Sequence, residues 1–116
     1  MIRIDTDRRP PIVDVTVASP ITQQELADAA ERLSAVPDVT RALVRVQAIK
    51  LSDASGLRPV PGAEAIAGRM QRVALLIGLG WYGMVAAAAK RFVPGLEIKR
   101  FGTGDEAGAT AWLLEG

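Results

Sequence analysis

The segment VALLI, residues 73–77, is an unbroken apolar run that leads directly into Gly78. Five apolar residues without polar alternation are typical of a strand that is covered on both faces of its sheet, as central strands of parallel sheets are. Parallel neighbours are joined by crossover connections, which are usually helices. The segment therefore predicts an α/β protein with helices packed on a sheet.

Four further segments have the pattern of strands. Residues 12–17 (IVDVTV) alternate with a period of two and place Val13, Val15 and Val17 on one face, which predicts a half-buried strand. The other predicted strands are residues 1–5, 41–46 and 96–101.

Four segments have the pattern of helices. The first follows Thr22, which stands three residues before Glu25 in a capping box, and it ends by Pro37. Thr103 and Glu106 form a second capping box before a C-terminal helix. The helices between these two are predicted at residues 63–71 and 81–92. The order β-β-α-β-α-β-α-β-α predicts a single domain, residues 1–116, with a mostly parallel sheet.

The composition restricts the function. Fourteen basic and thirteen acidic residues give a net charge of +1, so no nucleic-acid partner is expected. Without cysteine or histidine there is no ligand set for structural zinc, and no metal is expected. The uncharged stretch 73–89 is interrupted by three glycines, so a strand and a helix are expected rather than a membrane span. The N-terminus lacks the pattern of a secretory signal, and a cytoplasmic location is expected.

Gly78, Gly80 and Gly83 have the GxGxxG spacing of dinucleotide-binding turns, and Glu97 follows at about the expected distance. In such folds, however, the glycine turn usually follows the first strand and several crossovers come after it. Beyond the helix that begins here, only one strand and one helix remain. We therefore expect a tight turn between a strand and a helix, and no cofactor.

In residues 72–116, a strand ending in glycine leads to a helix headed by tryptophan, over 73–81. A last strand closes with Phe101, and the final helix carries Ala109 and the sequence AWL at 111–113. This half of the chain resembles the SpoIIAA-like proteins of the STAS superfamily. The resemblance implies a four- to five-stranded sheet with helices packed on it. It also implies protein binding or, as in related lipid-transfer domains, the holding of apolar ligands.

Residues 53–57, DASGL, follow the third predicted strand. They resemble the DSSGL of anti-sigma-factor antagonists in the same superfamily, where the second serine receives a phosphate and a helix beginning there docks a kinase. The resemblance implies that Ser55 is a phosphoacceptor. Pro59 and Pro61 follow, where those proteins continue the helix. Asp, Ser and Gly are also ordinary turn residues, and this second interpretation stays open.

Catalytic residues are not expected. A serine nucleophile would need a lysine or carboxylate base, and neither Ser52 nor Ser55 has a spacing that indicates one.

The sequence thus predicts a non-catalytic regulatory module that binds a protein partner, is controlled at Ser55 and forms a homodimer. Two alternatives remain: a carrier of a small apolar ligand or lipid near Trp81, and dinucleotide binding through the three glycines. Loops converge at the carboxyl ends of parallel strands, where we expect the binding surface. The residues predicted to bind the partner or ligand are Asp53, Leu57, Val60, Trp81, Tyr82 and Met84.

Overall fold

The computed structural model describes residues 1–5, 12–18, 20–36, 38–47, 58, 60, 62–78 and 96–115. Within them lie five strands and three helices. The strands are β1 (Ile2–Asp5), β2 (Ile12–Ala18), β3 (Arg41–Gln47), β4 (Arg72–Leu76) and β5 (Glu97–Phe101). The helices are α1 (Gln23–Ser34), α3 (Ala63–Arg69) and α5 (Glu106–Leu114).

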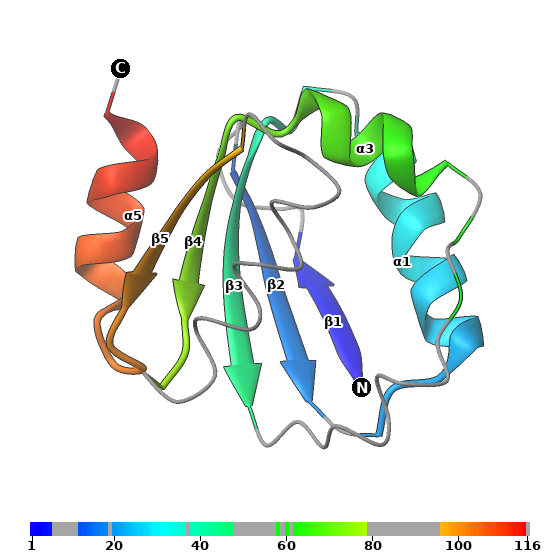
Figure 1. The fold of residues 1–116 in the computed structure, drawn as a ribbon, viewed down its shortest axis with the longest axis horizontal. Coiled ribbons are helices and arrows are strands. Elements are labelled where there is room, and N and C mark those ends of the chain that lie inside the picture. Colours follow the sequence, from blue (N-terminus) through cyan, green and yellow to red (C-terminus); the bar gives the residue numbers. More distant parts are fainter. Residues whose placement is uncertain are drawn as a thin grey trace.

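The strands form one sheet in the order β1-β2-β3-β4-β5 (Figure 1). β1 pairs antiparallel with β2, and every other neighbouring pair is parallel. The predicted α/β class and mostly parallel sheet are confirmed. The helix predicted at residues 81–92 lies outside the described residues.

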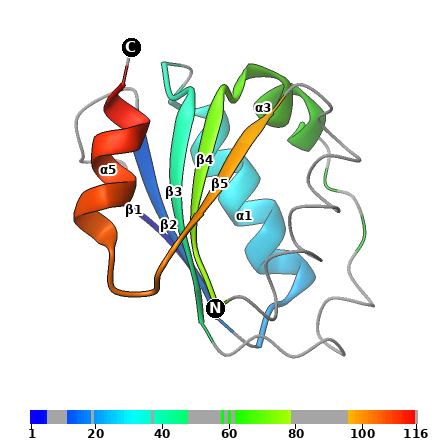
Figure 2. The same cartoon turned by 60° about the vertical axis from the view of Figure 1, so that its left-hand side comes forward.

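The described helices cover the two faces of the sheet unequally (Figure 2). α5 packs on one face, over β3, β4 and β5. α1 and α3 lie on the opposite face, where α1 packs beside β1 and against α3.

Each face carries its own hydrophobic cluster. The cluster under α5 consists of Ile12, Leu43, Ala74, Leu76, Ala109 and Leu113. The cluster on the α1 side consists of Ile4, Val13, Val39 and Ala42, with Ala29 and Leu33 of α1 packed against it. β4 is buried on both faces, as its apolar run predicts.

The prediction of a half-buried β2 is wrong at the start of that strand. Ile12 is 4% exposed and the adjacent Val13 is fully buried, although their side chains point to opposite faces. The reason is that β2 is an inner strand, and helices cover both faces of the sheet at that end. Alternation of polar residues begins only at Asp14.

The predicted capping box of α1 is present. The Glu25 N–H donates to Thr22 Oγ1 at 3.1 Å, and the Thr22 N–H donates to the Glu25 carboxylate at 3.3 Å. Two of the amide groups that lack partners in an isolated helix start are thereby satisfied.

The predicted capping box of α5 is wrong. Thr103 belongs to a turn in which the Asp105 N–H donates to the Gly102 carbonyl at 2.9 Å, so the helix begins two residues later. Asp105 is the N-cap, and its carboxylate accepts the Gly108 N–H at 3.1 Å. Gly108 has no side chain that could complete a reciprocal box.

Two arginines bind the C-terminal end of α5. Arg41 donates to the carbonyl groups of Leu113 and Glu115, and Arg72 donates to those of Trp112, at 2.9 Å, and Glu115. The Arg72 guanidinium also lies over the Trp112 ring, 5.2 Å from its centroid. The contacts with Leu113 and Glu115 supply donors to carbonyls at the helix end, whereas the Trp112 carbonyl also accepts the Glu115 N–H at 3.2 Å.

A third arginine, Arg69 at the end of α3, binds the C-terminal end of α1. Its guanidinium donates to the carbonyl groups of Leu33, Val36 and Val39. α3 is thereby fixed against α1 on one face of the sheet.

Candidate functional site

The carboxyl ends of the four parallel strands lie at one edge of the sheet, together with the first residues of α1 and α5 (Figure 1). We call this the carboxyl edge, after the strand-ending residues Ala18, Gln47, Leu76 and Phe101. Because the connections of a parallel sheet converge at this edge, it is where such folds usually bind their ligands.

Gln23 and Arg58 exchange two hydrogen bonds at this edge. The Arg58 N–H donates to Gln23 Oε1 at 2.9 Å, and Gln23 Nε2 donates to the Arg58 carbonyl at 3.1 Å. Gln23 is the first residue of α1, and Arg58 comes directly after the DASGL stretch. The backbone that leaves DASGL is therefore fixed beside the N-terminal turn of α1.

Arg45 of β3 connects the sheet with the start of α5. Its guanidinium pairs with Asp14 of β2 on one side and with Glu106, the first residue of α5, on the other. Partial burial lowers the pKa of Arg45, but the hydrogen bond that Arg45 donates to Asp14 and the charges of Asp14 and Glu106 outweigh this effect, so the pKa rises above its usual value. Arg45 therefore stays charged and holds α5 in place.

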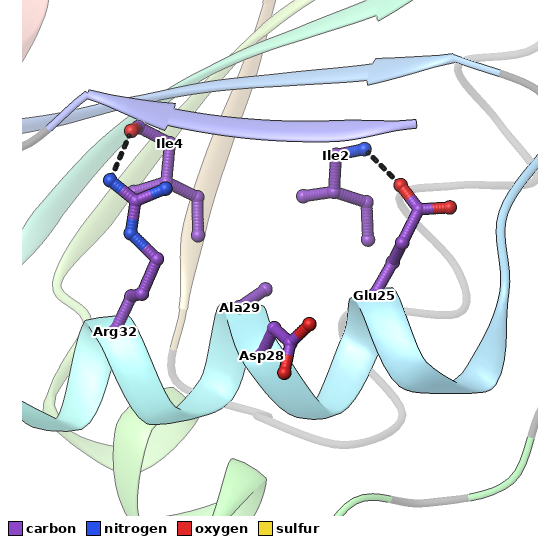
Figure 3. A pocket seen from close by; sticks show the side chains of 6 residues that line it. All are labelled: Ile2, Ile4, Glu25, Asp28, Ala29 and Arg32. Carbon is purple, nitrogen blue, oxygen red and sulfur yellow. Dashed lines mark hydrogen bonds between the residues drawn. The ribbon is translucent and has the colours of Figure 1, made fainter.

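A pocket of about 300 Å³ lies between β1 and α1 (Figure 3). It is lined by Ile2, Ile4, Glu25, Asp28, Ala29 and Arg32. At one end the Ile2 N–H donates to the Glu25 carboxylate at 2.9 Å, and at the other Arg32 Nη2 donates to the Ile4 carbonyl at 3.0 Å. Ala29 lies between these two contacts, and its short side chain leaves the space open.

None of the sequence patterns described above predicts this pocket. The sequence feature that relates to the pocket is the set Glu25, Ala29 and Arg32, which share one face of the helix. In this set a small side chain lies between two long, charged ones. These three residues indicate a space above Ala29 only when it is known that β1 packs beside this helix face.

Glu25 has more than one partner. Burial raises its pKa, but the hydrogen bond from the Ile2 N–H, the nearby Met1 ammonium group at 3.3 Å and the Thr22 N–H lower it, and the net shift is downward. Glu25 therefore carries its negative charge to lower pH than an ordinary glutamate.

The dinucleotide pattern is not completed by Glu97. Glu97 is the first residue of β5, at the amino ends of the parallel strands, and its carboxylate accepts from Arg72 Nε at 3.0 Å. Gly78 follows the opposite, carboxyl end of β4. A carboxylate at one edge of the sheet cannot meet a ribose bound at the other.

A family model described as SpoIIAA-like matches residues 12–114. The chain belongs to the SpoIIAA-like family. Members of this family are generally regulatory, protein-binding modules and are generally not catalysts. The resemblance in residues 72–116 is confirmed and extends over the N-terminal half. Comparisons with curated proteins and with solved structures found no significant match.

Most of the predicted site residues of this SpoIIAA-like chain lie outside the described residues. Those outside are Asp53, Ser55, Leu57, Gly80, Trp81, Tyr82, Gly83 and Met84. Of the predicted partner- or ligand-binding residues, the structure describes Val60, which is half-buried. Their assignment, including the apolar pocket near Trp81, stays a prediction.

Among the described residues, no helix is long and apolar enough to cross a membrane. Their Asp and Glu side chains form no group of three or more that could hold a metal ion.

Proposed function

We propose that this SpoIIAA-like domain is a regulatory module that binds a protein partner at the carboxyl edge, and that phosphorylation of Ser55 controls this binding. The observation that carries the proposal is the pair of hydrogen bonds between Gln23 and Arg58. It fixes the chain that leaves DASGL beside the start of α1.

Covalent geometry limits how far Ser55 can lie from that point. Ser55 is three residues before Arg58, and consecutive Cα atoms are 3.80 Å apart, so their Cα atoms are separated by at most roughly 11 Å. This limit allows a phosphate on Ser55 to approach the first turn of α1.

The first turn of a helix favours negative charge because its amide groups and the helix dipole are directed outward there. A phosphate adds nearly two negative charges and three strong acceptor oxygens. Arg58, whose side chain is exposed, supplies a positive charge at the same place. Phosphorylation would therefore change the charge of the carboxyl edge without requiring a change of fold.

The proposed contact surface combines Asp53, Leu57 and Val60 with Trp81, Tyr82 and Met84. Aromatic and methionine side chains are enriched at protein interfaces, which supports a protein partner. Family membership supports the same class of partner.

The test compares Ser55→Asp with Ser55→Ala in quantitative affinity capture from the cells that naturally make the protein. Ser52→Asp and Ser52→Ala are matched controls three residues away. We expect at least one captured protein to differ about tenfold between the Ser55 variants, a difference of about 1.4 kcal/mol in binding, and not between the Ser52 variants. Equal capture by both Ser55 variants, with circular dichroism showing an intact fold, would contradict the proposal.

Self-association is the second part of the proposal, with Tyr82 in the interface between two copies. Sedimentation of the wild type should show a dimer that weakens in Tyr82→Ser while the fold persists. Trp81→Ala tests whether the neighbouring aromatic residue takes part. A monomer whose sedimentation does not depend on concentration would contradict this part.

A further inference from the structure

We infer that the pocket between β1 and α1 is a binding site for a free α-amino acid (Figure 3). Its volume of about 300 Å³ is at the lower end of the range for small-molecule sites, so a small ligand is expected.

The backbone groups of β1 alternate in direction, toward β2 and away from it. Ala18 N–H donates to the Met1 carbonyl at 2.8 Å, so Met1 and Ala18 form a hydrogen-bonded pair of the antiparallel ladder. Such pairs alternate along the strand, which turns the N–H and C=O groups of Ile2 and Ile4 away from β2. The contacts of Ile2 with Glu25 and of Ile4 with Arg32 agree with this direction.

Two of the four outward groups are left for a ligand. Glu25 takes the Ile2 N–H and Arg32 takes the Ile4 C=O. Within the part of the chain that the structure describes, the Ile2 C=O and the Ile4 N–H have no hydrogen-bond partner. The edge thus offers one acceptor and one donor between the two occupied ends.

One acceptor and one donor in this order fit a single amino acid. In a parallel ladder, one residue of an added chain donates its N–H to a carbonyl of the strand. The carbonyl oxygen of the same added residue accepts the N–H that lies two residues further along the strand. The ligand nitrogen then lies beside the Ile2 C=O, and its carboxyl group lies beside the Ile4 N–H. A longer strand would meet Glu25 and Arg32, which already hold the next groups.

At the Ile2 end, the Met1 ammonium group is paired with the Glu25 carboxylate at 3.3 Å. The other two charged side chains that line the pocket, Asp28 and Arg32, favour the free zwitterion in this orientation. Arg32 lies at the Ile4 end, where the ligand carboxylate would be, and its guanidinium has further donors besides the one given to Ile4. Asp28 lies one helical turn closer to the Ile2 end, where the ligand ammonium group would be. Gln24 Nε2 binds one Asp28 oxygen at 2.9 Å and holds this carboxylate in position.

The experiment is an NMR titration of the ¹⁵N-labelled full chain, followed at the amides of Ile2, Arg3 and Ile4. The probes are glycine, L-alanine, L-leucine and L-glutamine. Each is raised to about 10 mM, which would nearly saturate a site with a Kd of about 1 mM. Ethylamine and acetate carry one charge each, and N-acetyl-L-alanine methylamide represents a residue inside a peptide.

We expect saturable shifts at these amides with at least one amino acid, and at least tenfold weaker binding of the three analogues. Asp28→Asn and Arg32→Gln should each weaken binding by a similar factor, whereas Glu31→Gln, an exposed residue outside the pocket, should not. Ala29→Met should abolish binding by filling the space, and Ala35→Met, at the exposed helix end, should leave it unchanged.

The absence of saturable shifts with all four amino acids would overturn the inference. Binding of the blocked alanine as tight as that of L-alanine would also overturn it, since the site would then recognise a peptide residue rather than the zwitterion. Loss of binding in Glu31→Gln or Ala35→Met to the same extent as in the pocket variants would have the same meaning. None of these outcomes depends on Ser55 or on a protein partner.

Discussion

Arg41 and Arg72 are direct register partners at the starts of β3 and β4, and both donate hydrogen bonds to carbonyl groups at the C-terminal end of α5. Two adjacent parallel strands thus begin with side chains that fix the last turn of the same helix. The positive charge of the two arginines also interacts favourably with the negative end of the helix dipole. α5 has no basic residue in its own last turn, so the sheet supplies the charge.

Replacing Arg72 by Gln should lower the free energy of unfolding by about 1.5–3 kcal/mol, because hydrogen bonds from a charged donor are lost at two carbonyls. The contact with the Trp112 ring is lost as well. Urea denaturation would measure the change. Arg3→Gln is the control, since Arg3 is an exposed β1 residue, and it should change stability by less than about 0.5 kcal/mol. Equal effects of the two substitutions would contradict this role of Arg72.

The start of α5 offers a comparison between two candidate caps. Asp105→Ala should destabilise the protein by about 1 kcal/mol, because the Gly108 N–H loses its acceptor. Thr103→Ala should have little effect, since Thr103 lies in the preceding turn. Thermal and urea denaturation of both variants would test this order, and a larger loss in Thr103→Ala would show that the helix begins earlier.

Gln23→Ala should change how the protein responds to charge at Ser55. The substitution removes both hydrogen bonds that hold Arg58 beside α1. We expect the difference in partner capture between Ser55→Asp and Ser55→Ala to shrink at least threefold in this background. Gln24→Ala, in the adjacent position without a contact to Arg58, is the matched control and should preserve the difference.

Glu25 should make stability dependent on pH in the acidic range. Its pKa is lower in the folded protein than in the unfolded chain, so its contribution to stability is fully present above the ordinary glutamate pKa of the unfolded chain. The contribution is lost as the pH falls through the lower folded value. Glu25→Gln keeps a residue suited to the capping box but removes the charge. Unfolding between pH 2 and pH 7 should therefore show a flatter acidic limb in Glu25→Gln than in the wild type or in Glu31→Gln.

Local patterns predicted much of this fold. The capping box of Thr22 and Glu25 depends on residues three positions apart, and the apolar run of β4 depends only on its own side chains, so both could be found from the sequence. The N-cap of α5 was harder to predict from the sequence because Thr103 and Asp105 are both favourable N-cap residues. The turn closed by Gly102 and Asp105 decides between them.

Features that depend on distant pairing could not be found in this way. Ile12 is buried because α5, nearly a hundred residues later in the chain, contributes Ala109 and Leu113 to the cluster around it. The pocket at Ala29 exists because α1 packs beside β1, and no periodicity within α1 specifies that neighbour. Gln23 and Arg58 are likewise 35 residues apart.

The two contacts that α1 makes with β1 also bear on aggregation. An exposed edge strand is a template on which other chains can add further strands, as in fibrils. The Glu25 carboxylate holds the Ile2 N–H and the Arg32 guanidinium holds the Ile4 carbonyl. A full strand from another molecule could therefore pair with β1 only after these two side chains had released its backbone groups, so the helix protects this side of the sheet against uncontrolled polymerisation.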